Sequence, residues 1–200
     1  MLQVNQRRVN FAVRQPIGGT SMKSIELILR RSVAYFLDIF FLFLILAPLA
    51  FVVEYLLGIQ PQTSGQVWMA AIISFSIPVW TYFTLSDASK NGASVGKTIM
   101  GIHISRLEPF AKLSLQQALA RTATKLLPWE LAHVFGFALS DTVGDKVRAA
   151  GLVAANVLTL LYFVAFVITG GRRSIHDLVV STQVIRRTRR VIPRNKEQAA

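Results

Sequence analysis

The chain contains no cysteine, which excludes disulfide bonds, thiol catalysis and thiolate metal sites. It also carries little charge, because only 16% of its 200 residues are Asp, Glu, Lys or Arg, against about 25% in soluble domains. Acidic residues are the scarcest, with 10 Asp and Glu against 22 Lys and Arg. Apolar residues instead make up 52% of the chain and gather in long blocks. This combination indicates a membrane protein.

Three apolar blocks, residues 33–57, 67–86 and 149–169, predict helices that cross a membrane, because about 20 mostly apolar residues span the hydrocarbon. A fourth block, "LLPWELAHVFGFAL" at 126–139, is shorter, and its length fits either a short crossing or a re-entrant segment. The preceding stretch, 114–127, has apolar residues at three- and four-residue steps. It predicts an amphipathic helix with Arg121 and Lys125 opposite or flanking the apolar face.

The distribution of Lys and Arg favours four crossings over three. Six of these residues precede the first block, none lies in 58–66, six lie in 87–126, two lie in 140–149, and eight follow the last block. Short positive loops stay in the cytoplasm, so both termini are expected there. That arrangement needs residues 126–139 as a third, short crossing and makes the amphipathic helix cytoplasmic.

Two short segments of alternating β-forming residues, 99–105 and 181–185, predict a two-stranded ribbon on the cytoplasmic side. The predicted fold is therefore an all-α membrane bundle of about four crossings with a β ribbon. Residues 1–22 are predicted to be a flexible basic extension, 24–187 the transmembrane domain and 188–200 a basic tail. The basic excess is attributed to orientation in the membrane rather than to nucleic-acid binding.

Asp38 lies in the middle of the first apolar block, in "RRSVAYFLDIFF". A carboxylate at the centre of a spanning helix costs about 2.5–3.5 kcal/mol and so suggests a function. Arg31 lies on nearly the same face but about 10.5 Å away along the axis, too far for an ion pair within the helix. A partner from another segment is expected, with Arg172, Arg173 and His176 as the candidates. The alternative to an ion or proton role is a structural clamp between helices.

Two further clusters contain ionisable residues. Glu130 and His133, in "PWELAH", share one helical face and suggest a proton relay, or an interfacial segment in which Glu130 meets Arg121. One such pair is half of a carboxylate di-metal signature, so no metal site is expected. In "RRSIHDL", Ser174 would cap a helix with Asp177 at its third position, or Asp177 would face the cytoplasmic mouth. The Gly-Lys-Thr at 96–98 lacks the spacing of a phosphate loop.

The stretches "RRSVAYFLDIFF", "GASVGKTIMGIHI" and "RRSIHDLVVSTQVI", in this order, resemble the RDD family of bacterial membrane proteins. "LPWELAH" is similar to a stretch in some members. The resemblance covers residues 24–187, and the residues that match the arginine and two aspartates of the family name are Arg31, Asp38 and Asp177. It implies a multipass protein of the bacterial inner membrane, commonly with three crossings. It also implies a cation/proton antiport role of the kind proposed for some members.

Two functions remain open from the sequence. The first is a monovalent cation or proton transporter that uses Asp38 with Arg31 and Asp177, taking Na⁺, H⁺ or another small cation and working as a homo-oligomer. The second is a non-transporting scaffold whose basic cytoplasmic face binds anionic lipid headgroups or a partner. An enzyme is not expected, because no nucleophile–base pair is evident, and no cofactor is expected either.

Overall fold

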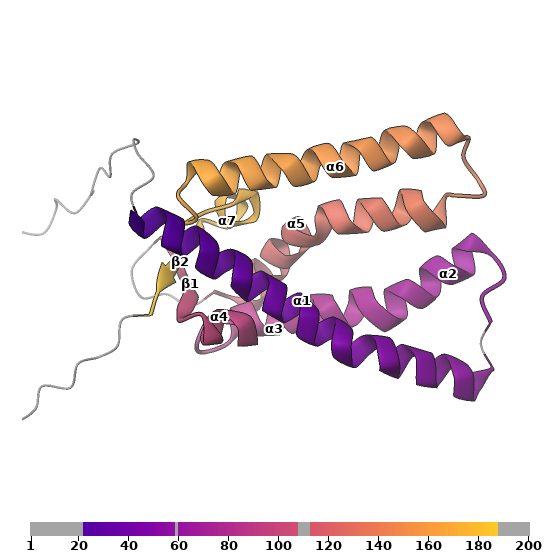
Figure 1. The fold of residues 1–200 in the computed structure, drawn as a ribbon, viewed down its shortest axis with the longest axis horizontal. Helices are drawn as coiled ribbons and strands as arrows, with labels where there is room; N and C mark the ends of the chain where they lie inside the picture. The colour runs from indigo at the N-terminus through magenta and orange to yellow at the C-terminus, as the bar shows by residue number, and fades with distance from the viewer. Residues whose placement is uncertain (1–21, 59, 108–112, 188–200) are drawn as a thin grey trace, which may run out of the picture.

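A computed structural model describes residues 22–58, 60–107 and 113–187 and shows a bundle of helices running along one long axis (Figure 1). Helix α1 (Met22–Leu57) is the longest. It ends at Gly58, whose φ of 64° is a left-handed conformation that glycine adopts at little cost. Apart from Met22, which begins α1, the predicted terminal extension and tail lie outside the described residues.

The chain returns along the bundle through α2 (Ser64–Ala71), the π-helix η1 (Ile72–Ser76) and α3 (Ile77–Ala88). Thr63 begins α2 by accepting a hydrogen bond from the Gln66 backbone N–H, which satisfies a donor that the first helical turn leaves unpaired. The π-turn ends just before Pro78. Since proline has no N–H to donate, a widened turn at this point keeps the segment helical.

A small polar cap forms at the end of the bundle where α1 begins (Figure 1). It contains α4 (Val95–Ile99), α7 (Ile175–Val179) and the strands β1 (Ile102–Arg106) and β2 (Thr182–Arg186). The strands pair antiparallel, with Ile104 opposite Val184, which confirms the predicted ribbon. It starts three residues later than predicted, because Ser94 caps α4 and residues 95–99 are helical.

The predicted amphipathic helix and the predicted short crossing are one element, so the division between them was wrong. Helix α5 (Leu115–His133) runs through Pro128 and continues directly into the π-helix η2 (Val134–Ala138). Pro128 cannot donate to the carbonyl of Thr124, four residues earlier. The Tyr162 hydroxyl takes that place and donates to this carbonyl at 2.6 Å. The neighbouring helix therefore repairs the break that the proline would cause.

Helix α6 (Asp145–Ile168) packs against α5, and α5 also packs against α3. In the described part of the chain, three segments are long and apolar enough to cross a membrane: 22–57, 64–88 and 145–168. The segment α5–η2 runs beside α6 (Figure 1) without being apolar enough to count among them. Glu26 and Arg186 form an ion pair, so the described chain starts and ends at the same end of the bundle.

The bundle exposes apolar side chains and buries polar ones. On α1 the buried residues are Leu27, Ala34 and Asp38, whereas Phe36 and Phe51 are exposed. This distribution suits a lipid surrounding, in which polar groups must be satisfied inside the protein. The main apolar core lies between the ribbon and the adjacent helix ends, and its buried members are Leu27, Ala34, Ile102, Ile104, Leu113, Ala118 and Val184.

Candidate functional site

Asp38 is 1% exposed and accepts three hydrogen bonds. The Tyr82 hydroxyl donates to Oδ1 at 2.6 Å, the Gly96 backbone N–H to Oδ1 at 2.7 Å, and the Ser94 hydroxyl to Oδ2 at 2.5 Å. Asp38 therefore lies inside the protein with donors from other segments, as the sequence predicted. The predicted identity of those donors was wrong, because they come from α3 and the start of α4 rather than from Arg172, Arg173 or His176.

The start of α4 reaches Asp38 because its sequence allows a very close approach to α1. Ser94 precedes the helix in an extended conformation, and its hydroxyl also accepts from the Lys97 backbone N–H at 3.4 Å. A Cβ at Gly96 would lie 2.1 Å from the Ala34 carbonyl oxygen. Only glycine leaves room for this contact, which brings the Gly96 N–H and the positive end of a helical turn to the carboxylate.

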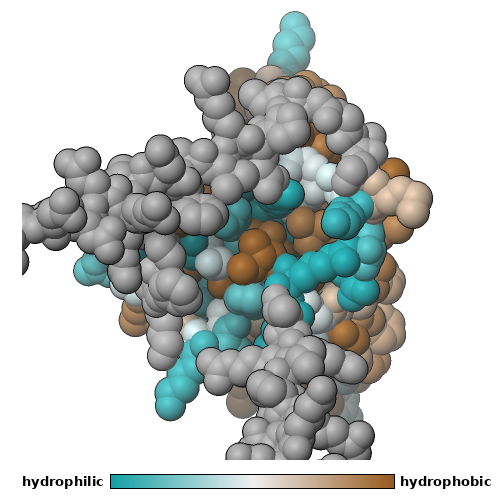
Figure 2. All heavy atoms as spheres, turned by 90° about the vertical axis from the view of Figure 1, so that its left-hand side faces the viewer, coloured by the Kyte–Doolittle hydropathy of each residue, from teal (hydrophilic) through white to brown (hydrophobic). Residues whose placement is uncertain are grey.

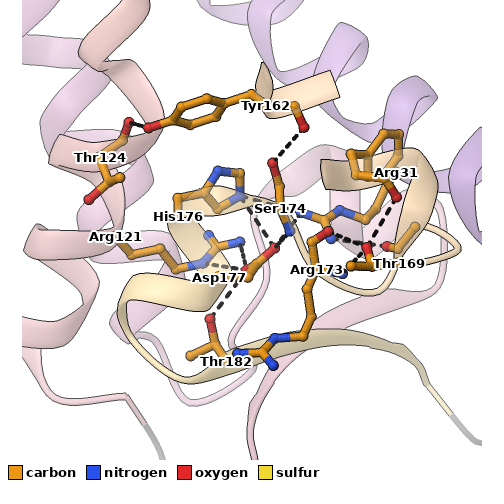
Figure 3. Close-up of polar contacts among 12 residues, drawn as sticks. Arg31, Arg121, Thr124, Tyr162, Thr169, Arg173, Ser174, His176, Asp177 and Thr182 are labelled. Carbon is orange, nitrogen blue, oxygen red and sulfur yellow. Dashed lines mark hydrogen bonds and ion pairs between the residues drawn. The ribbon is translucent and has the colours of Figure 1, made fainter. Parts of the chain in front are cut away.

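Asp177 connects α1 with α5 through its two carboxylate oxygens (Figure 3). Its Oδ2 accepts from Arg31 Nη2 at 2.7 Å, and its Oδ1 accepts from Arg121 Nη2 at 2.7 Å and Nε at 3.0 Å. Asp177 also accepts from the Ser174 backbone N–H at 2.9 Å, as predicted for the capping position at the start of α7. The Arg31–Asp177 pairing joins two residues that the family resemblance had singled out.

Arg121 extends this pairing to a second carboxylate. Its Nη1 donates to Asp87 Oδ2, and Lys97 Nζ donates to Asp87 Oδ1 at 2.7 Å. Both carboxylates are fully buried and Arg121 is 1% exposed. The result is a chain of alternating charges, Arg31–Asp177–Arg121–Asp87–Lys97, that joins α1, α7, α5, α3 and α4. We call these five residues the ion-pair chain.

The surroundings of α7 fix the protonation of its two ionisable groups. Burial would raise the pKa of Asp177, but the charges of Arg121 and Arg31 outweigh it and hold that pKa well below its ordinary value. Burial lowers the pKa of His176 well below its ordinary value, and Arg121 and Arg31 add to this effect against the opposing charge of Asp177. At neutral pH the pair is therefore a carboxylate beside a neutral imidazole.

We expect the fold to lose stability as the pH falls from about 6.5 to about 4.5. A histidine whose pKa is lowered on folding contributes its full stability above its unfolded pKa of about 6.5, and this is lost below that value at up to about 1.4 kcal/mol per pH unit. Asp177, with a lowered pKa, begins to lose its contribution only below about 3.9, so the two pH ranges are separate. His103, whose pKa burial also lowers, contributes to the same slope.

The measurement is thermal unfolding in neutral detergent at pH 7.5, 6.0 and 4.5 for the wild type and His176→Gln. The glutamine variant should lose much less stability over this range, since it has no imidazole to protonate. An unchanged slope in His176→Gln would assign the pH dependence to other groups.

Glu130 does not meet Arg121, the partner that one of its two interpretations gave it. Glu130 accepts from the Trp80 indole N–H at 2.9 Å and from the Ser76 hydroxyl at 3.2 Å, so the predicted contact with Arg121 was wrong. His133 Nδ1 lies 2.9 Å from the Trp129 carbonyl oxygen. Glu130 thus ties α5 to η1 and α3. Within the described residues, no three His, Asp or Glu side chains gather as metal ligands would.

The basic residues predicted at the mouth are divided between the surface and the interior. Arg172 is exposed and its carbonyl accepts from the Val184 backbone N–H at 2.9 Å. The Arg173 backbone N–H donates to the Thr169 hydroxyl at 3.1 Å. His176 is buried, and its Nε2 lies 3.3 Å from Arg31 Nη2. Of the three, His176 is the one that joins the site.

A cavity of about 450 Å³ adjoins Asp38 and the ion-pair chain. Four basic side chains line it, from Arg31, Lys97, Arg121 and Lys125, and Asp38 is the carboxylate among its lining residues. The remaining lining side chains are mostly apolar or aromatic, and most of them come from α1, α5 and α6. The cavity is large enough for a small organic ligand, and its charge is predominantly positive.

Sequence reasoning missed Tyr82, Asp87, Lys97 and Arg121 as members of the site. Arg121 was assigned to the flank of an amphipathic helix, and Lys97 was examined only within a rejected phosphate loop. One signal was available: a leucine-rich helix in a membrane protein turns its polar side inward, because its surroundings are lipid.

Comparison with known proteins gives one match. A model of the RDD family matches residues 26–181, a range that contains Arg31, Asp38, the whole ion-pair chain and the lining of the cavity. No curated protein and no solved structure matches the chain.

Proposed function

Because the chain belongs to the RDD family and is a membrane protein with buried charges, we propose that it is a proton-coupled transporter in which Asp38 takes up and releases the proton. The observation that carries this proposal is the position of Asp38. It lines the cavity, and its partners are two hydroxyls and a backbone N–H rather than a cationic side chain.

Hydroxyl partners let a carboxyl group change its protonation state in place. Tyr82 and Ser94 donate to Asp38 when it is ionised, and either hydroxyl can turn to accept when Asp38 carries a proton. Asp87 and Asp177 have no such freedom, because protonating either one would break ion pairs with buried guanidinium or ammonium groups. Asp38 is therefore the carboxylate best placed for a reversible proton transfer.

A proton fits this site better than a metal cation. Sodium needs several oxygen lone pairs directed at it, whereas the Gly96 N–H points its hydrogen at Asp38. We therefore narrow the expected cation to H⁺.

We further propose that both termini are cytoplasmic in a bacterial inner membrane, on the basis of the Lys and Arg distribution, and that a homodimer or larger assembly provides the pathway.

Asp38→Asn should abolish proton flux. The amide keeps the shape and can still accept hydrogen bonds, so the protein should still fold, but it cannot bind and release a proton at physiological pH. The measurement is the pH change inside proteoliposomes after an imposed pH gradient. Asp141→Asn is the matched control, because Asp141 is exposed in the loop between η2 and α6, and it should keep wild-type flux. Flux in Asp38→Asn equal to the wild type would contradict the proposal.

A second candidate is a membrane scaffold that binds anionic lipid. It is favoured by the end of the bundle that bears the ribbon, where Figure 2 shows hydrophilic side chains around a smaller apolar patch. Among the residues that the structure describes, the exposed basic ones near this end are Lys23, Lys90, Arg172, Arg186 and Arg187. Each Lys or Arg near an anionic surface contributes about 1 kcal/mol. Absence of flux in the wild-type protein itself would favour this candidate.

A further inference from the structure

The basic side chains around the cavity outnumber the carboxylates. Four basic side chains line it, those of Arg31, Lys97, Arg121 and Lys125, whereas the buried carboxylates beside them are those of Asp38, Asp87 and Asp177. The basic side chains therefore exceed the carboxylates by one, and a basic group in a poorly hydrated interior is stabilised as a cation when an anion binds beside it.

Lys125 is the basic side chain in excess. Asp177 is shared by Arg31 and Arg121, and Asp87 by Arg121 and Lys97. In the described chain, no carboxylate lies within ion-pairing distance of Lys125. Its ammonium nitrogen instead sits 2.9 Å from the centroid of the Phe83 ring and 5.1 Å from that of Tyr35. Aromatic faces attract a cation but do not neutralise it, so Lys125 offers three N–H donors beside the cavity.

The other walls of the cavity are apolar and reach the outside of the bundle. Aromatic side chains on three helices line it, namely Tyr35 on α1, Trp129 on α5, and Tyr162, Phe163 and Phe166 on α6. Tyr35, Trp129 and Phe163 are about half exposed, so they form a rim where the cavity meets the lateral surface. In a membrane protein that surface faces lipid, and a ligand entering there needs an apolar part.

From this arrangement we infer that the cavity binds a monoanionic amphiphile, with a carboxylate or phosphate-ester headgroup at Lys125 and an alkyl chain along the aromatic wall. One anionic head supplies the partner that the described carboxylates do not give Lys125. The alkyl chain accounts for the apolar lining and the lateral opening, which a free inorganic anion would not use. The idea that this amphiphile is the transported substrate rests on the proposed function. The idea that it binds in the cavity does not.

Binding can be measured without flux, by calorimetric titration of the protein in phosphatidylcholine nanodiscs with empty nanodiscs subtracted. Dodecanoate should bind the wild type, whereas dodecanol and acetate, which lack the charge and the chain respectively, should bind at least about tenfold more weakly, equivalent to about 1.4 kcal/mol. Nanodiscs containing phosphatidylglycerol should compete with dodecanoate if the natural ligand is a phospholipid and not if it is a free acid. Either result is consistent with a site for an anionic headgroup, and the two differ only in the source of the ligand.

Lys125→Met should weaken dodecanoate binding about tenfold or more, and Lys125→Arg should largely restore it. Because Lys125 has no ion-pair partner among the described residues, replacing it leaves no carboxylate without its cation, and the fold should survive. If the methionine variant does not fold, Lys125→Gln takes its place. Lys146→Met, at an exposed position in the first turn of α6, is the matched control and should bind like the wild type. Equal binding of dodecanol and dodecanoate, or undiminished binding in Lys125→Met, would overturn the inference. Binding without flux would refute the transporter and leave this site in place.

Discussion

Arg121→Ala should be among the most destabilising single substitutions in this protein, lowering its free energy of unfolding by about 3–5 kcal/mol. The reason is that Arg121 neutralises two buried carboxylates, those of Asp87 and Asp177. Removing the guanidinium leaves Asp87 with Lys97 and Asp177 with Arg31 as their remaining ionic partners. It also removes the ion pairs that join α5 to α3 and α7.

Two controls separate this effect from a general loss of charge. Arg186→Ala breaks an ion pair with Glu26 whose side chains are each 43% exposed, and such pairs contribute little because water screens them. Arg121→Lys keeps the charge but not the planar fork that serves two carboxylates, so its loss should be intermediate. The measurement is denaturation in mixed micelles followed by circular dichroism. Equal losses for Arg121→Ala and Arg186→Ala would show that the ion-pair chain does not hold the helices together.

The membrane character and the ribbon could be predicted because local sequence determines them. Apolar length identifies a spanning helix, and alternation of β-forming residues identified β1 and β2 to within a few residues. The burial of Asp38 followed from the same logic, since a carboxylate exposed to hydrocarbon has no partner.

The ion-pair chain could not be predicted, because its pairs join residues far apart in sequence. Arg121 is 34 residues from Asp87 and 56 from Asp177, and no helical spacing relates them. The donors to Asp38 could not be predicted for the same reason. The candidates chosen by charge were Arg172, Arg173 and His176, but the packing of α4 on α1 places neutral donors beside the carboxylate. The continuity of α5 through Pro128 likewise depends on Tyr162, which belongs to another helix.

The close contact of α4 with α1 leads to the last prediction, which concerns Gly96→Ala. The added methyl group would lie 2.1 Å from the Ala34 carbonyl oxygen and 3.0 Å from Asp38 Cγ. The first of these neighbours is backbone, so relief requires α4 to move away from α1. That movement would break the hydrogen bonds from Gly96 and Ser94 to the carboxylate.

One added methyl group should therefore destabilise the protein by about 3–5 kcal/mol, from overpacking at about 1–3 kcal/mol and from weakened hydrogen bonds to a buried charge at about 1.5–3 kcal/mol. Gly65→Ala is the matched control, because Gly65 lies in helix α2 with nothing within 4 Å of an added Cβ. That variant should be more stable than the wild type by up to about 1 kcal/mol, since alanine favours helix over glycine. Opposite signs for the two glycines in the same denaturation assay are the expected result. A Gly96→Ala protein as stable as Gly65→Ala would mean that α4 does not pack on α1 at this distance, and the hydrogen bonds that hold Asp38 would have to be reassigned.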